Sequence, residues 1–276
     1  QVTQGGIINF LNAIYTGMLG SCPSGSGTVS NSINLVTSTG SILGASASAI
    51  PQAVTPTLSV VYFIATITPE EDVTVTEEQL ITGFIISTYL TPGGYKTSTF
   101  GPSTFATANQ QLQLTTGQSY TIIWEVEVQN NFAPGSTYAT AIWLAYLFSN
   151  STGYNPIPTS PNTPGGDIWL QGTAGSSTTI CGYQFNALNL ISYGGAVYTS
   201  QSGQPYLLIW ALINNPGQGI VINGIVNYSG GPQLGNSTGG SVGCGILVFT
   251  NFSYQIPAPS QSLPLVTFFM TITVVS

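Results

Sequence analysis

Two acidic side chains offer the clearest possibility of catalytic chemistry in this sequence. Glu125 and Glu127 alternate along one predicted strand, so both point to the same side with their carboxylates roughly 7 Å apart. Paired carboxylates perform acid and base catalysis in glycoside hydrolases. The residues that follow are Gln129, Asn130 and Asn131, with no third acid nearby. A surface role for the pair is therefore favoured over catalysis.

A second acidic group could hold a metal ion, because carboxylate oxygens are ligands that Ca²⁺ prefers. It contains five of the eight acids of the chain: Glu70, Glu71, Asp72, Glu77 and Glu78. The group lacks the Asp/Asn/Gly spacing of a known calcium loop, so a solvated turn or a docking patch is the favoured interpretation. The chain has no His, which disfavours zinc and copper sites and removes Ser–His and Cys–His nucleophile systems. We expect no enzymatic activity and no cofactor.

The strand that positions Glu125 begins within an eight-residue sequence motif that occurs twice in the chain and is called the repeated phrase below. GQSYTIIW at residues 117–124 recurs as GQPYLLIW at residues 203–210, and each copy is followed by an Asn pair and a Pro-Gly turn. Six of the eight positions are identical or exchange Ile for Leu. A repeat of this length suggests two related modules.

The two copies differ in their binary pattern. After residue 120 the first copy alternates apolar and polar residues, as in a half-exposed strand, whereas the second is apolar on both faces through Ile213. We expect the second strand to be covered on both sides, by the other module, a neighbouring subunit or the N-terminal segment. Leu207, Ile209 and Ile213 form the predicted buried interface.

The whole chain has the pattern of an all-β protein, with about ten short strands, turn signals between them and no convincing long helix. We predict two tandem β-sandwich domains of the Ig-like or jelly-roll type, separated by a proline-rich segment. The predicted organisation is an apolar N-terminal tail over 1–23, a Ser/Gly/Thr-rich linker over 24–50, and sandwiches over 51–155 and 165–276.

The apolar residues of the tail recur with helical spacing, so a helix is favoured over a strand. An isolated helix of this length is marginal in water, and the tail must find an apolar groove on its own subunit or on a neighbour. Its deletion is expected to leave a folded monomer. The predicted contact residues are Ile7, Ile8, Phe10, Leu11, Ile14, Tyr15, Met18 and Leu19.

Charge is unusually scarce, with one Lys or Arg and eight Asp or Glu, or 3% of residues, where ordinary domains have about 25%. Such a surface responds little to pH and suits an acidic exterior. It also lacks the net repulsion that keeps proteins apart, which favours self-association. No basic patch is available to bind nucleic acid, and no apolar run reaches the roughly 20 residues of a membrane span.

Several features point to an extracellular protein. The first residue is Gln1, which predicts removal of a signal peptide and secretion to the cell surface. N-linked glycans are expected at four sequons, whose asparagines are Asn150, Asn227, Asn236 and Asn251. Cys181 and Cys244 both fall in the second module and are the predicted disulfide, which leaves Cys22 free or linking subunits.

A nearly uncharged Thr/Ser/Asn/Tyr-rich β chain with sequons and an apolar tail resembles surface proteins of hot-acid archaea and of their viruses. In layout it is most similar to thread-like and bundling-pilus subunits. The resemblance implies donor-strand complementation, in which each tail completes the sheet of the next subunit. The helical spacing of the tail departs from that pattern, because a donor segment should be extended.

The function expected from these features is that of a homopolymeric filament subunit on an acidophilic or thermophilic archaeon. A virus capsid or turret protein, or an S-layer component, is the alternative. A carbohydrate-binding adhesin is the third candidate.

Overall fold

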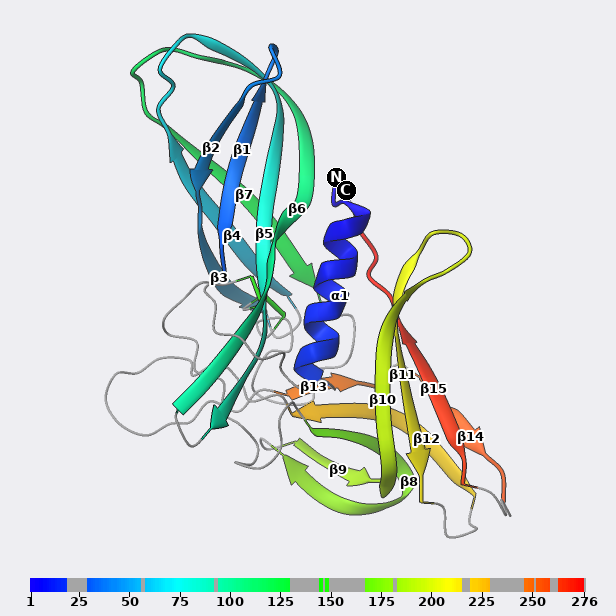
Figure 1. The fold of residues 1–276 in the computed structure, drawn as a ribbon. Coiled ribbons are helices and arrows are strands. Elements are labelled where there is room, and N and C mark those ends of the chain that lie inside the picture. Colours follow the sequence, from blue (N-terminus) through cyan, green and yellow to red (C-terminus); the bar gives the residue numbers. More distant parts are fainter. Residues whose placement is uncertain are drawn as a thin grey trace.

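The computed structural model describes residues 1–18, 29–55, 58–91, 94–129, 144–145, 147–148, 167–180, 183–214, 219–228, 246–250, 252–258 and 263–275. Within these residues the fold is all-β with several antiparallel sheets, as the sequence predicts, and with one short helix, α1 (Gln4–Met18). Figure 1 shows two groups of strands with α1 lying between them.

The first module contains two antiparallel sheets, with strand orders β2-β1-β5-β6 and β3-β4-β7. Its strands are β1 (Asn31–Thr37), β2 (Ile42–Ser46), β3 (Ser48–Thr55), β4 (Leu58–Ile67), β5 (Val73–Thr91), β6 (Gly94–Leu114) and β7 (Tyr120–Gln129). The sheets contact each other through β1 and β2 on one side and β3 and β4 on the other. Alternate apolar residues such as Ile33, Leu35 and Phe63 fill the space between them.

The predicted linker over 24–50 is wrong from residue 31 onward, because β1, β2 and the start of β3 lie there. In β1 the buried positions include Asn31, Ile33 and Leu35, while small polar side chains take the positions between them. Asn31 is buried because its Nδ2 donates to the Phe148 carbonyl at 3.1 Å and its Oδ1 accepts from the Thr82 hydroxyl. The first module therefore begins well before residue 51.

The second module also contains two antiparallel sheets. Their strand orders are β10-β11-β15 and β13-β12-β8-β9, and β14 pairs with β12. The strands are β8 (Asp167–Ile180), β9 (Tyr183–Ala187), β10 (Leu190–Thr199), β11 (Pro205–Ile213), β12 (Ile220–Tyr228), β13 (Ile246–Phe249), β14 (Tyr254–Ile256) and β15 (Leu265–Met270).

The described residues at 144–145 and 147–148 lie outside the sheets of the first module. Leu144 and Ala145 are helical, and Leu147 and Phe148 form a turn. Buried Phe148 contacts Phe63, Phe84 and Phe105 with ring centroids 4.8 to 5.8 Å apart. This turn therefore belongs to the core of the first module without extending either sheet.

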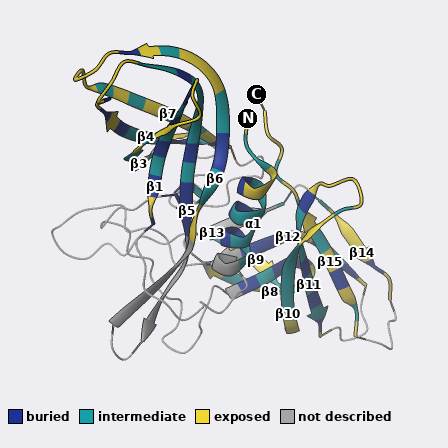
Figure 2. Ribbon diagram, turned by 45° about the horizontal axis from the view of Figure 1, so that its top comes forward, coloured by how far each residue is buried: buried dark blue, intermediate teal, exposed yellow. Residues whose placement is uncertain are grey.

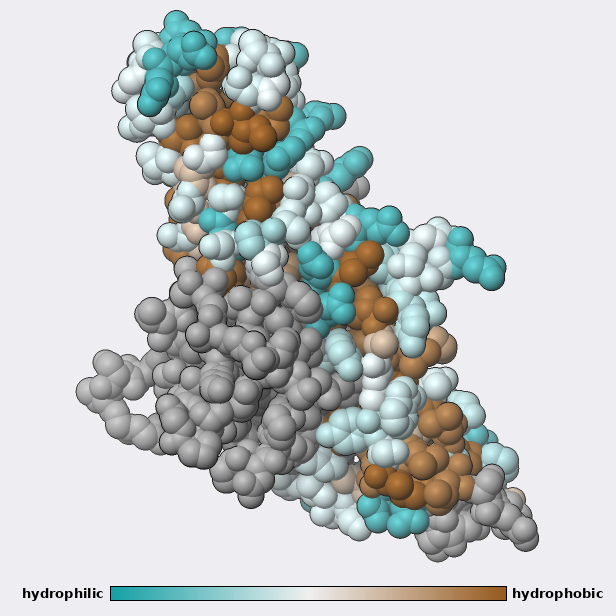
Figure 3. Space-filling view, viewed as in Figure 1, coloured by the Kyte–Doolittle hydropathy of each residue, from teal (hydrophilic) through white to brown (hydrophobic). Residues whose placement is uncertain are grey.

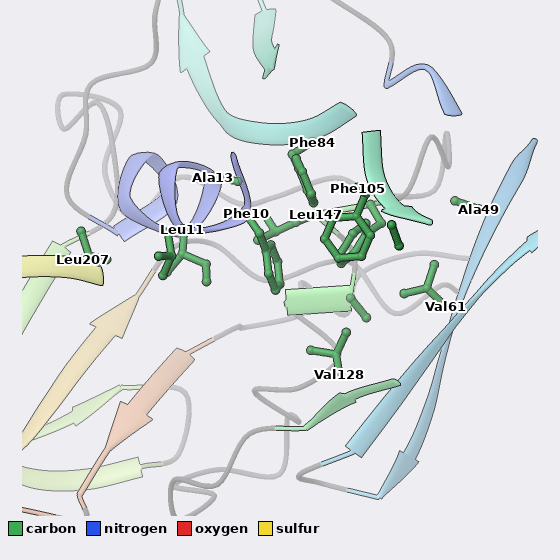
Figure 4. Close-up of a cluster of buried hydrophobic side chains, with 14 of the residues drawn as sticks. Phe10, Leu11, Ala13, Ala49, Val61, Phe84, Phe105, Val128, Leu147 and Leu207 are labelled. Atoms are coloured by element: carbon green, nitrogen blue, oxygen red, sulfur yellow. The ribbon is translucent and has the colours of Figure 1, made fainter. Parts of the chain in front are cut away.

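The two modules share one hydrophobic core. A single connected cluster of buried residues contains side chains from α1 and from all four sheets. Figure 4 shows how α1 joins the halves, with Phe10 directed to the phenylalanines of the first module and Leu11 directed to Leu207 of the second. The modules are thus not two independently packed domains joined by a linker.

Candidate functional site

The groove that holds α1 is the most elaborate site in the described part of the chain. Strands β5 and β6 of the first module contact α1 on one side, and β10 and β11 of the second module contact it on the other. Figure 2 shows buried residues on β5, β6 and β11 beside the helix. We call this groove the α1 seat.

The first three residues fix α1 to the edge of β6. The amide of Thr3 donates to the Phe105 carbonyl at 2.8 Å, and the amide of Thr107 donates to the Gln1 carbonyl at 2.9 Å. Val2 and Ala106 are the bridge pair between these bonds. The N-terminus therefore adds a very short antiparallel strand to the first module.

Thr3 also begins the helix. Its Oγ1 accepts a hydrogen bond from the Gly6 amide at 2.9 Å, which is the geometry of an N-cap. The same hydroxyl donates to the Thr104 carbonyl at 2.7 Å. One side chain thus sets both the start of α1 and its position on β6.

On the side of the first module, α1 packs closely enough to require glycine. A Cβ atom built on Gly6 would lie 2.6 Å from the Phe105 carbonyl oxygen, so the helix backbone touches the strand directly. One turn later, Phe10 stacks on Phe84 at 5.5 Å and contacts Phe148 at 5.0 Å. Asn9 Nδ2 donates to Ser103 Oγ at 2.6 Å beside them.

On the side of the second module, α1 covers one face of the repeated strand. Leu207, Ile209 and Ile213 are 0%, 1% and 0% exposed, on the face of β11 that shares the core. Gln4 Nε2 donates to the Gly203 carbonyl at 2.6 Å, which ties the helix to the turn before β11. In this structure the chain's own N-terminal segment supplies part of the cover, together with the second sheet of the same module.

The tail residues named from the sequence lie mostly in the seat. Phe10, Leu11 and Ile14 are buried, and Ile7, Ile8 and Tyr15 are half-buried. Met18 ends α1, and Leu19 lies outside the described residues. The prediction from a single apolar stripe did not include Gly6 and Ala13. A helix between two modules is buried on two sides, and small residues permit its close approach to the strands.

The two copies of the repeated phrase share a local structure but differ in their surroundings. Each begins with a glycine of positive φ, +72° at Gly117 and +82° at Gly203, and then enters a strand. β7 is an edge strand that pairs with β4, whereas β11 lies between β10 and β15. The second copy is therefore paired on both edges, but it is buried on one face only. Leu207, Ile209 and Ile213 are buried, whereas Leu208 and Trp210 on the opposite face are half-buried, so the expectation of cover on both faces is wrong for that face.

Glu125 and Glu127 lie exposed on the outward face of β7. Their ladder partners on β4 are Tyr62 and Val60. The structure brings no third carboxylate from the described residues to this pair. This geometry gives no support to a glycosidase site.

The five clustered acids are divided between a turn and β5. Asp72 accepts a hydrogen bond from the Thr116 amide at 2.8 Å, and the Thr116 hydroxyl donates to the Glu70 carbonyl at 2.8 Å. Glu71 is exposed in the same turn. Within the described ranges no three His, Cys, Asp or Glu side chains come together as metal ligands. Of the turn acids, Asp72 thus uses its carboxylate to connect two loops of the first module.

Glu77 and Glu78 lie on β5, where Gln79 Nε2 donates to the Glu77 carboxylate at 2.6 Å. Glu78 pairs with buried Leu35 in the ladder, and burial raises the pKa of its carboxyl above the ordinary value. A raised pKa means that ionised Glu78 lowers the stability of the folded state at neutral pH. This loss disappears as the pH falls below the unfolded pKa of about 4.3.

Replacing this carboxyl with a neutral amide should therefore stabilise the protein at neutral pH. We expect Glu78→Gln to raise the urea midpoint at pH 7 and to give no gain near pH 3. Glu125→Gln, on an exposed position of β7, is the matched control and should leave the midpoint unchanged. Urea titrations followed by tryptophan fluorescence measure both, and a lower midpoint for Glu78→Gln at pH 7 would contradict the expectation.

The expected modification sites fall largely outside the described residues. These are Asn150, Asn236, Asn251 and the three cysteines, Cys22, Cys181 and Cys244. Asn227 lies on β12, where its backbone pairs with Ile168 and Leu247. Glycosylation and the Cys181–Cys244 disulfide remain predictions.

Within the described residues, the structure has no helix with the length and apolarity that crossing a bilayer requires. Comparison of the chain with known protein families, with curated proteins and with solved structures finds no match.

Proposed function

We propose that this protein is a structural subunit of an extracellular homopolymer, in which α1 of one copy occupies the α1 seat of the next. The observation that carries the proposal is that one terminal element contributes side chains to the cores of both modules. The scarcity of charge supports it, because copies approach with little repulsion. The lack of His and of a basic patch is consistent with an acidic exterior, such as that of an acidophilic archaeon.

The physical basis of exchange is that the seat makes the same contacts with a helix from either source. Domain swapping of an identical element is a low-cost route to assembly. Phe10, Leu11 and Ile14 are buried in the seat, and burial of each is worth about 1.5–3 kcal/mol. A helix of 15 residues that includes three glycines is marginal alone. It is therefore stable only when seated, whether in its own chain or in a neighbour.

The mode of exchange differs from the donor-strand insertion implied by the resemblance. Only residues 1–3 are extended and pair with β6, while the rest of the segment is helical. The exchange is thus a helix placed in a groove, with a short added strand at its start. In this interpretation the structure shown is the unassembled subunit with its own helix in place.

A disulfide that fastens the N-terminus to its own β6 tests the exchange. The Val2–Ala106 pair lies between the two hydrogen bonds of the bridge, the arrangement in which paired Cα atoms are about 4.5 Å apart. This separation fits a disulfide. We expect the oxidised Val2→Cys/Ala106→Cys variant to form no polymer under conditions in which the wild type polymerises, and to polymerise after reduction.

The single variants Val2→Cys and Ala106→Cys cannot form this bond and are the matched controls. Wild-type protein is treated with the same oxidant and reductant, because three natural cysteines are present. Negative-stain electron microscopy and light scattering are the readouts, and the images also separate filaments from closed shells. Polymerisation of the oxidised double variant at the wild-type rate would rule out exchange, as would a wild type that never polymerises.

A further inference from the structure

The outward face of the β10-β11-β15 sheet is apolar and uncovered. The opposite face of these strands forms the core, as Leu207 and Ile209 show. We call the uncovered surface the β11 outer face. Its large residues are Tyr198, Tyr206, Leu208, Trp210, Leu265 and Phe269. Figure 3 shows hydrophobic surface over the part of the molecule that holds β11 and β15.

The exposure of this face is unusual for large apolar residues. Tyr198, Leu265 and Phe269 are 50%, 61% and 63% exposed, and the residues from β11 between them are half-buried. Three strands about 4.8 Å apart and six residues long give a footprint of about 300 Å². Apolar patches of a few hundred Å² on a monomer often mark interaction sites.

The aromatic side chains on this face hold one another in place. Tyr198 stacks on Tyr206 with ring centroids 5.9 Å apart, and Phe269 meets Tyr206 edge-on at 5.6 Å. Trp210 lies against Gly194 of the neighbouring strand, where a Cβ atom would come within 2.6 Å of the indole. A surface already ordered in this way loses little side-chain entropy when a partner covers it.

The distribution of charge indicates what kind of partner fits. All eight acids lie at or before Asp167, and residues 168–276 contain no Asp, Glu, Lys or Arg. A charged partner would leave its ions desolvated and unpaired against this face. The same face of a second copy is equally uncharged and equally apolar, so two copies can meet here with their acidic first modules outside the contact.

We infer that the β11 outer face is a homotypic contact surface, on which two copies of the chain pack against each other. This contact deepens the proposed homopolymer, on which it rests, by adding a lateral contact that is separate from α1 exchange. A footprint of about 300 Å² is well under the roughly 800 Å² per partner of a standard stable interface. The contact is therefore a reversible one that depends on concentration.

The test replaces the two most exposed aliphatic and aromatic residues of the face. Leu265→Thr/Phe269→Thr removes apolar area and introduces β-branched residues, which favour strands. The matched control is Ile50→Thr/Ile123→Thr, which makes the same type of change at residues that are 50% and 61% exposed on the first module. Sedimentation velocity over a concentration series measures self-association of the full chain.

All measurements are made in the oxidised Val2→Cys/Ala106→Cys background as well as in the wild type. In the locked background α1 exchange is absent, so any remaining association reports on the β11 outer face alone. We expect reversible association that the Leu265→Thr/Phe269→Thr change weakens at least about tenfold in dissociation constant. The Ile50→Thr/Ile123→Thr control should change it less than about threefold. If the oxidised Val2→Cys/Ala106→Cys variant still polymerises, that result contradicts α1 exchange only. It does not bear on the β11 outer face.

Two results would overturn the inference. One is equal association of the face variant and the control. The other is binding of the locked monomer to a neutral polysaccharide such as dextran, lost in Trp210→Ala, without any self-association. Thermal unfolding checks that each variant is folded, and Tyr198→Ser on edge strand β10 repeats the test if the double variant is destabilised.

Discussion

A chain that lacks residues 1–18 should lose the stable fold of both modules, in addition to its ability to assemble. The deletion removes Phe10, Leu11, Ala13 and Ile14 from the shared core. Burial of the three large side chains is worth about 5–9 kcal/mol, before any term for the cavity left behind. Native domains are stable by only about 5–15 kcal/mol in total. The expectation from sequence, a folded monomer, does not allow for this shared core.

The truncated chain should recover when the missing helix is supplied separately. We expect its thermal midpoint to fall by more than about 15 °C, or its transition to disappear, and a synthetic peptide of residues 1–18 to restore much of the loss. The same peptide with Leu11→Asp is the control, because Leu11 is fully buried against the second module. Circular dichroism melts with increasing peptide measure the effect. A truncated chain that melts like the wild type would show that α1 is dispensable for folding.

The strands that could be predicted are those rich in apolar β-branched and aromatic residues. β4, β7, β11 and β15 are of this kind. β8 and most of β6 are rich in Ser, Thr and Gly, and β1 is flanked by segments of that kind, a composition that also describes a linker. They become strands because a neighbour supplies the ladder hydrogen bonds, as β5 does for β1, and that partner is not visible in local sequence.

The candidate site was only partly predictable for a related reason. Because an apolar face must be covered, the sequence identified Leu207, Ile209 and Ile213 as buried residues. Hydrophobicity does not specify which element covers them. The covering helix is chosen by shape, through close approaches such as that of Gly6 to Phe105. The acid pair shows the reverse case. Glu125 and Glu127 had suitable types and spacing, yet their neighbours across the ladder, Tyr62 and Val60, supply no chemistry.

The glycines at the start of α1 give the sharpest test of how closely the helix is seated. Both lie in the first helical turn, where replacement by Ala favours the helix by up to about 1 kcal/mol. Around Gly5 nothing lies within 4 Å of an added methyl group, so Gly5→Ala should stabilise the protein slightly. Around Gly6 the same methyl group would lie 2.6 Å from the Phe105 carbonyl oxygen and 2.9 Å from its Cα.

Strand β6, which faces Gly6, cannot move away from the helix without breaking contacts of Phe105. Phe105 is bonded to Thr3 through its carbonyl, and its ring packs on Phe84 and Phe148. Overpacking against such a neighbour costs about 1–3 kcal/mol, occasionally more. After the helix gain of up to about 1 kcal/mol, Gly6→Ala should destabilise the fold by about 1 kcal/mol net. Urea unfolding of the two variants, in the oxidised Val2→Cys/Ala106→Cys background and without it, gives the two values. Stabilisation by Gly5→Ala together with destabilisation by Gly6→Ala would show that the helix backbone packs directly on β6. Equal stabilisation by both would mean that α1 does not occupy its seat in solution.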